Sequence, residues 1–176
     1  MSFISRNHPQ QVAARGPLDE VDDRETHPDD FARWDARYGP FTLDVAAAHH
    51  NAKCPRYFTR ADDGLVQSWA GERVWCNPPY SNLAAWTEKA WREMGRDCRG
   101  IVMLLPANRC EQPWWQRWVE PWRDRPQYEL GVTLTTEFLA GQLRFIKPGA
   151  TEIKPNERPP FGCVLLIWTR GYEVRR

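Results

Sequence analysis

The residues best suited to chemistry are Asn77-Pro78-Pro79-Tyr80, which follow the apolar run 74–76. Such a run is typical of the end of a buried strand. Each proline then fixes φ near about −65° and removes a backbone donor. Because a residue before proline is kept out of the helical region, Asn77 and Pro78 should both be extended. The corner therefore presents an amide side chain, a free carbonyl and an aromatic ring.

This corner fits a planar heterocycle that carries an exocyclic amino group. The two N–H hydrogens of that group can be donated to the Asn77 side-chain oxygen and the Pro78 carbonyl, while Tyr80 stacks on the ring. Four residues alone are equally compatible with a proline-rich turn that ends a strand. The choice between these interpretations therefore depends on the rest of the chain.

The elements after the corner predict a strand–helix–strand unit. Ser81 can cap a helix with apolar residues at helical spacing, and Gly95 can end it. The run 101–105 is apolar throughout and bounded by Gly100 and Pro106, as expected of a central parallel strand. In such a unit the corner lies at the carboxyl end of the first strand.

A second candidate site residue is Asp44, at the end of the short apolar segment 41–45. Ligands bind at the carboxyl ends of parallel strands, so this carboxylate could contact one. Residues 46–48 are all alanine, which lets a ligand approach the backbone closely. Asp44 could instead only cap the turn that follows.

The chain divides into a flexible N-terminal arm, residues 1–24, and one domain, residues 25–176. The arm lacks periodicity, whereas Pro28 can open a helix that Gly39 ends. Adjacent His49 and His50 with Cys54 do not form a convincing metal set. The chain has 176 residues, enough for one core.

Composition excludes several function classes. The net charge of +1 does not indicate a nucleic-acid binder, so any DNA contact must come from local arginine clusters. The five cysteines are widely spread, which favours free thiols in a reducing cytoplasm over disulfides or zinc. No apolar run reaches the roughly 20 residues of a membrane span, and no signal peptide is recognisable. We therefore expect a cytoplasmic protein without a metal.

Further landmarks accompany the corner in a fixed order from about Glu25 to Thr169. They are Leu43-Asp44-Val45-Ala46-Ala47, Asp63-Gly64-Leu65, Trp69, Leu104-Leu105-Pro106-Ala107, Leu143-Arg144-Phe145 and Pro160-Phe161-Gly162. With them the chain resembles the Dam-type DNA N6-adenine methyltransferases of phages and prophages. The resemblance implies an α/β fold, an abbreviated Rossmann-like class I methyltransferase. Its sheet would be mostly parallel and end in an antiparallel hairpin, here formed by 133–146 and 161–169.

The resemblance also implies an activity: transfer of a methyl group from S-adenosylmethionine to adenine N6 in double-stranded DNA. It places the enzyme in phage DNA modification, with or without a restriction nuclease, in the host cytoplasm. The implied catalytic residues are Asn77, Pro78, Pro79 and Tyr80. The implied cofactor residues are Pro28, Asp44, Val45, Ala46 and one or both of Asp62 and Asp63. The implied DNA contacts are Ser81, Asn108, Arg109 and Arg144.

The chain departs from the family pattern at two positions, with His27 in place of threonine before Pro28 and Gln142 in place of arginine. The segment from Pro113 to Arg125 combines tryptophans with arginines, which favours a core helix but leaves DNA contacts open. Two alternative functions remain. One is methylation of another planar amine or amide, cytosine N4 or protein glutamine. The other is DNA binding by a fold that has lost catalysis.

Overall fold

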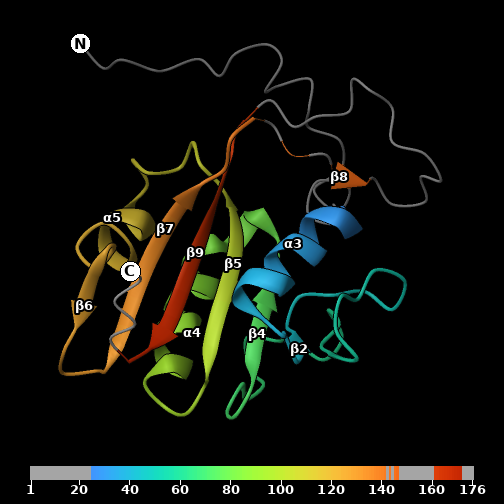
Figure 1. Ribbon diagram of the computed structural model, residues 1–176, viewed down its shortest axis with the longest axis horizontal. Helices are drawn as coiled ribbons and strands as arrows, with labels where there is room; N and C mark the ends of the chain where they lie inside the picture. Colours follow the sequence, from blue (N-terminus) through green and yellow to red (C-terminus); the bar gives the residue numbers. More distant parts are fainter. Residues whose placement is uncertain (1–24, 142, 144, 147–160, 172–176) are drawn as a thin grey trace.

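A seven-stranded sheet forms the centre of the computed structural model, which describes residues 25–141, 143, 145–146 and 161–171 (Figure 1). The strand order is β3-β2-β4-β5-β9-β7-β6. These strands are β2 (Leu43–Asp44), β3 (Arg56–Tyr57), β4 (Arg73–Cys76), β5 (Gly100–Pro106), β6 (Arg125–Gln127), β7 (Val132–Phe138) and β9 (Cys163–Arg170). A separate two-stranded sheet pairs β1 (Glu25–Thr26) with β8 (Phe145–Ile146).

The direction of the strands confirms the predicted fold class. β3, β2, β4 and β5 are parallel. β9 is antiparallel to its neighbours β5 and β7, and β6 is antiparallel to β7. The sheet is thus Rossmann-like, parallel on the side of the corner, and its C-terminal part is the expected antiparallel hairpin of β7 and β9.

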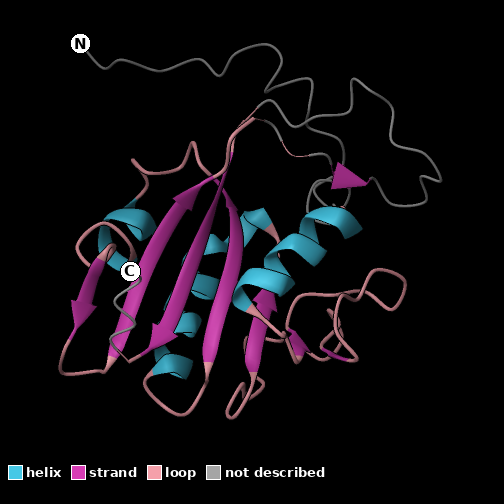
Figure 2. Cartoon of the chain, viewed as in Figure 1, coloured by secondary structure: helices cyan, strands magenta, loops and turns pink. Residues whose placement is uncertain are grey.

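Helices cover both faces of the sheet (Figure 2). Helix α3 (Pro28–Tyr38) lies on one face, where Trp34 stacks on Trp75 at 5.5 Å. Helices α4 (Leu83–Met94) and α5 (Pro113–Trp118) share a core with Val74 and Cys76, which point to the other face. Every residue of β5 is buried, because a central strand that is covered on both faces has no polar face.

The beginnings of the helices agree only partly with the sequence prediction. Pro28 opens α3 as predicted and Gly39 follows its last residue, while Nδ1 of His27 accepts the Asp29 N–H at 3.2 Å as the cap. The prediction that Ser81 caps α4 is wrong. Ser81 lies inside the 3₁₀ turn η1 (Tyr80–Asn82), which brings the chain from the extended Pro79 into the helix. Asn82 precedes α4 without a side-chain cap.

The connection from β2 to β4 is abbreviated, as predicted. Its residues 45–72 are all described, and they contain β3 but no helix. The chain places β3 on one side of β2 and then returns to place β4 on the other. A reversal of strand order of this kind opens a crevice at the carboxyl ends of the two strands, where α/β sheets bind ligands.

The prediction of one strand over 133–146 is wrong. β7 ends at Phe138, and Gly141 turns the chain with a φ of 74°. Residues 145–146 instead pair with β1, a contact distant in sequence that no local pattern reveals. The arm 1–24 and the loop 147–160 lie outside the described residues. Among those described, no helix has the length and apolarity that crossing a membrane requires.

Candidate active site

The Asn77–Tyr80 corner directly follows a firmly anchored strand end. Cys76 closes β4 with no exposed surface, and burial raises the pKa of its thiol well above the usual range. Pro78 is buried, whereas Asn77, Pro79 and Tyr80 are partly exposed. The corner is therefore fixed by the sheet below it while its amide and ring remain accessible.

A cavity of about 580 Å³ lies where β2 and β4 end. The predicted site residues that line it are Asp44, Val45, Ala46, Asp63, Asn77, Pro79 and Ser81. The predicted residues that do not line it are Pro28, Asp62, Pro78, Tyr80, Asn108 and Arg109. Arg144 lies outside the described residues. The fold thus brings the acidic end of β2 and the amide corner of β4 to one cavity.

Asp44 has two structural roles at once. Its side chain is 3% exposed and accepts the backbone N–H groups of Ala46 at 3.2 Å and Lys53 at 3.0 Å. Burial raises the pKa of Asp44 to about 6, although these hydrogen bonds and the Lys53 charge oppose the rise. The carboxylate therefore caps its own loop and also faces the cavity.

The two neighbouring acids Asp62 and Asp63 differ in their surroundings. The Asp62 carboxylate accepts the backbone N–H and the hydroxyl of Thr59, at 2.8 and 2.7 Å, and these bonds lower its pKa. Asp63 lines the cavity, has a left-handed φ of 54° and accepts the N–H of Leu65 at 3.1 Å. Of the two, Asp63 is the acid that a ligand in the cavity would meet.

Sequence reasoning missed the end of the cavity formed by β1. Glu25 and Thr26 line it together with Lys53, whose Nζ donates to Glu25 at 2.6 Å. The Thr26 hydroxyl is buried and has no hydrogen-bond partner among the described residues. A buried hydroxyl is costly unless it is bonded, so a ligand in the cavity would be a suitable partner.

The other side of the corner is formed by two loops, the one after β5 and the one before β9. Tyr80 and Phe161 make an edge-to-face contact with their ring centroids 6.2 Å apart. The Gly162 carbonyl accepts the N–H of Ala107 at 2.8 Å, which joins the loop before β9 to the loop after β5. Asn108, next in that loop, is exposed at the same edge of the sheet.

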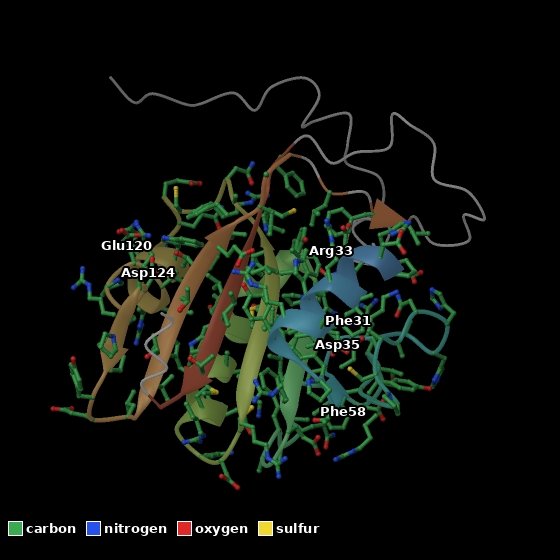
Figure 3. The ribbon with its side chains drawn as sticks, viewed as in Figure 1. Phe31, Arg33, Asp35, Phe58, Glu120 and Asp124 are labelled. Carbon is green, nitrogen blue, oxygen red and sulfur yellow. The ribbon has the colours of Figure 1, made fainter. Side chains whose placement is uncertain are left out.

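The prediction that the tryptophans from Pro113 onward are core residues is confirmed for Trp114 and Trp115, while Trp118 is partly buried against the core and Trp122 is exposed. Trp114 and Trp115 are buried against α4. Arg117 stacks on Trp118, with 4.8 Å between its guanidinium carbon and the ring centroid. Arg123 pairs with Glu120 and Asp124. Figure 3 shows Glu120 and Asp124 at the opposite edge of the sheet from Phe58.

The candidate metal residues do not converge in the described part of the chain. His49 and the Tyr57 hydroxyl interact at 3.0 Å, and Cys54 is buried in the core. No group of three or more histidine, cysteine or acidic side chains is suitably placed among the residues that the structure describes.

Comparison with known proteins places this site in a family. The family model for DNA N-6-adenine-methyltransferase (Dam) matches residues 16–173. The chain belongs to this family. The match spans every predicted site residue.

Individual relatives match shorter segments of this Dam-family chain. DNA N-6-adenine-methyltransferases from Escherichia phage T1 and Haemophilus phage HP1 are each 35% identical, over 79 and 68 residues. These segments cover 44% and 39% of the chain but only 33% and 39% of the relatives, so well under half of each relative is spanned. The putative methyltransferase YfdM of Escherichia coli K12 is 38% identical over 71 residues, which cover 36% of the chain and 77% of that protein.

A solved structure, a putative RNA methyltransferase from Pyrococcus horikoshii, resembles the fold with a TM-score of 0.44 and 12% identity. The likeness covers 90% of this chain and 78% of that one. So distant a likeness supports no argument about function. The assignment to the Dam family rests on the sequence match alone.

Proposed function

We propose that this Dam-family protein transfers a methyl group from S-adenosylmethionine to the N6 amino group of adenine in double-stranded DNA. The observation that carries the proposal is that Asp44 and Asn77, from adjacent strand ends, line one cavity. One side of this cavity has the groups that a cofactor needs, and the other side has Asn77, the amide of the corner to which an exocyclic amine could donate.

The residues of the cavity fit the cofactor by charge and by size. The Asp44 carboxylate suits the α-ammonium or the ribose diol, and Val45 and Ala46 leave the backbone open beside it. Asp63 can accept a hydrogen bond from the amino group of the cofactor's adenine, and Leu65 and Trp86 form an apolar wall beside that ring. The Thr26 hydroxyl, which has no partner among the described residues, offers one further hydrogen bond. Pro28 supports this end from the first turn of α3. When bound, S-adenosylmethionine supplies an electrophilic methyl group.

The corner activates the amine by hydrogen bonding. The lone pair of the adenine amine is delocalised into the ring, which makes the nitrogen a poor nucleophile. Hydrogen bonds from its two N–H groups to the Asn77 side chain and the Pro78 carbonyl favour the pyramidal form that can attack. Pro79 fixes the geometry. No strong base is required, because the proton becomes acidic only after methylation.

The target base has to leave the duplex before it reaches the corner, at a cost of a few kcal/mol. Stacking on Tyr80 would recover roughly 1–3 kcal/mol of that cost. Ser81, Asn108, Arg109 and Arg144 are the proposed DNA contacts, and the cytoplasm of the host cell is the proposed location.

Attack at cytosine C5 is a poor fit to this cavity, because it needs a cysteine thiolate. Cys76 is the cysteine adjacent to the corner, and it is fully buried with a raised thiol pKa. Cys76 therefore has a packing role, and Cys76→Ala should remain active.

The deciding experiment is product analysis. The purified protein is incubated with S-adenosylmethionine and unmethylated double-stranded DNA, which is then digested and its nucleosides identified by mass spectrometry. N6-methyladenine is expected with the wild type and Cys76→Ala, but not with Asn77→Ala. N4-methylcytosine as the sole product would refute the base assignment. Absence of any methyl transfer by a protein that still binds the cofactor and DNA would favour the non-catalytic alternative. Methyl transfer to glutamine in a protein substrate would favour the alternative of a protein methyltransferase.

A further inference from the structure

Part of the wall of the cavity is a stretch of coil, Asp63-Gly64-Leu65. This coil approaches the loop after β2 so closely that a Cβ at Gly64 would lie 2.2 Å from the Val45 carbonyl oxygen. This position therefore requires glycine, and small displacements of the coil would change the shape of the cavity. Coil without a helix must be held in place by side chains.

Trp69 is the first of these side chains. Its indole N–H donates to the Gly64 carbonyl at 2.9 Å, and the residue has no exposed surface. Its ring lies nearly parallel to that of Trp86, with centroids 6.3 Å apart, and Trp86 lines the cavity. Trp69 therefore supports the wall from behind at two points.

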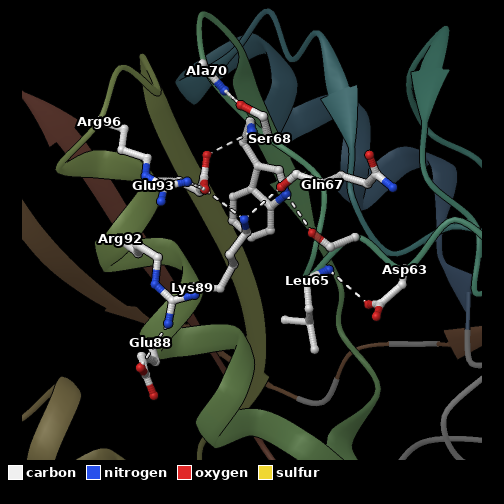
Figure 4. A network of polar contacts seen from close by, with 12 residues as sticks. Asp63, Leu65, Gln67, Ser68, Ala70, Glu88, Lys89, Arg92, Glu93 and Arg96 are labelled. Atoms are coloured by element: carbon white, nitrogen blue, oxygen red, sulfur yellow. Dashed lines mark hydrogen bonds and ion pairs between the residues drawn. The ribbon is translucent and has the colours of Figure 1, made fainter.

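A buried ion pair on α4 completes the support (Figure 4). Lys89 Nζ donates to the Gln67 carbonyl and to Glu93 Oε1, both at 2.7 Å. Glu93 Oε2 accepts the backbone N–H of Trp69 at 2.8 Å. Lys89 is 4% exposed and Glu93 0%, and Lys89 Nζ lies 5.4 Å from the centroid of the Trp69 ring. The ion pair itself lies within α4, while the contacts with Gln67 and Trp69 join the helix to the coil.

A buried ion pair of this kind is a costly way to gain stability alone. Taking both charges out of water offsets much of their attraction, and a well-packed apolar pair often does as well. Burial by itself would raise the pKa of Glu93, but hydrogen bonds from Lys89 and the Trp69 backbone hold it below the usual value. The hydrogen bonds that offset the desolvation of the two charges also fix one conformation of residues 67–69.

We propose that Trp69, Lys89 and Glu93 are positioning residues that hold the Asp63–Leu65 wall against the adenosyl part of the cofactor. This rests on the proposed function, in which that wall meets the adenine ring. Because α4 also begins three residues after Tyr80, the same helix connects the cofactor wall with the catalytic corner. Weakening the support should therefore lower cofactor affinity and leave the chemistry intact once cofactor is saturating.

The first test removes the indole N–H from Trp69. Trp69→Phe should raise the dissociation constant for S-adenosylmethionine about five- to tenfold by calorimetry, because one hydrogen bond to the wall is lost. Trp168→Phe is the matched control. Trp168 is equally buried and belongs to the same core, but its indole N–H makes no hydrogen bond among the described residues. Its substitution should leave cofactor affinity within about twofold while it creates a cavity of similar size.

The second test replaces the ion pair. The double variant Lys89→Met with Glu93→Gln should raise KM for S-adenosylmethionine several-fold and leave kcat at saturating cofactor within about twofold. Its control is Glu88→Gln with Arg92→Met, which removes an exposed pair of the same spacing on the same helix. The double variant of Lys89 and Glu93 keeps the proposal testable if Trp69→Phe fails to fold.

The outcomes separate this proposal from the function on which it rests. If the wild type binds no S-adenosylmethionine, the proposed function fails. If the wild type binds it but each variant matches its control, the positioning role is overturned and the function stands. A fall in kcat at saturating cofactor, with KM unchanged, would likewise overturn it.

Discussion

The two connections that leave the site are built on different principles. From β4 to β5 the chain forms η1 and the regular helix α4, while from β2 to β4 residues 45–72 form turns and one two-residue strand. α4 satisfies its own backbone and buries an apolar face that includes Leu83, Trp86, Ala90 and Met94. The coil depends on side chains: Asn51 accepts the N–H of Ala48, Asp62 that of Thr59, and Trp69 donates to Gly64.

This difference suggests how each connection should respond to mutation. In α4, most of the buried face is apolar, so stability comes mainly from packing and not from the residues of the corner before it. In the coil, the polar groups that form the cavity wall also hold the backbone. Substitutions at the corner should therefore affect catalysis with little loss of stability, whereas substitutions in the coil should affect both.

Asn77→Ala should give the largest effect and tests the first half of this contrast. Because the amide acts mainly on the transition state, kcat should fall on the order of 100-fold or more, while cofactor affinity and the unfolding midpoint change little. Steady-state methylation, calorimetry with S-adenosylmethionine and thermal melting measure the three quantities. A variant that loses cofactor binding as well would show that the corner is not separable from the cavity.

The pH dependence of stability at Asp44 tests whether a polar group of the cavity wall also contributes to the stability of the fold. Burial raises its pKa from 3.8 to about 6, so between these values the folded protein keeps a proton that the unfolded chain has lost. The contribution of Asp44 to stability should therefore fall as pH rises from about 4 to 6 and level off above. The full difference is on the order of 3 kcal/mol.

Asp44→Asn removes this titration, so urea unfolding of both proteins between pH 4 and pH 7 measures it. The stability of the wild type relative to the variant should decline across that range. Parallel pH profiles would mean that the buried carboxylate does not titrate as the structure indicates. Asp44→Ala is a poorer probe, because it also leaves the N–H groups of Ala46 and Lys53 without an acceptor.

The sequence predicted features that depend on local pattern. The apolar run 101–105 and the helical spacing of α3 and α4 have short-range causes, and both prolines of the corner act on their immediate neighbours. The choice between Asp62 and Asp63 depends instead on a turn closed by Thr59, and the Thr26 end of the cavity depends on β1 pairing with β8. The ion pair on α4 has ordinary i,i+4 spacing in the sequence. That it is buried under the coil follows only from the tertiary fold.

Phe161 extends the contrast to the DNA side of the corner. Its edge-to-face contact with Tyr80 should hold the ring that stacks on the extruded base, and such pairs contribute about 0.5–1.5 kcal/mol beyond buried area. Phe161→Ala should therefore raise KM for DNA roughly two- to tenfold without changing cofactor affinity. Phe161→Tyr keeps the ring and should behave like the wild type. Equal KM values for the two variants would argue against a role for the aromatic contact.

The smallest effect is expected for the exposed pair Glu88–Arg92 on α4. The Arg92 guanidinium nitrogen lies 3.0 Å from Glu88 Oε1, but the side chains of Glu88 and Arg92 are 47% and 51% exposed, so water and salt screen the attraction. Arg92→Ala should cost no more than about 0.5 kcal/mol of unfolding free energy in low salt, and less in 1 M salt. Urea unfolding at both salt concentrations measures this. A loss well above 1 kcal/mol would mean that the exposed face of α4 also depends on polar side-chain contacts, as its buried Lys89–Glu93 pair and residues 45–72 do.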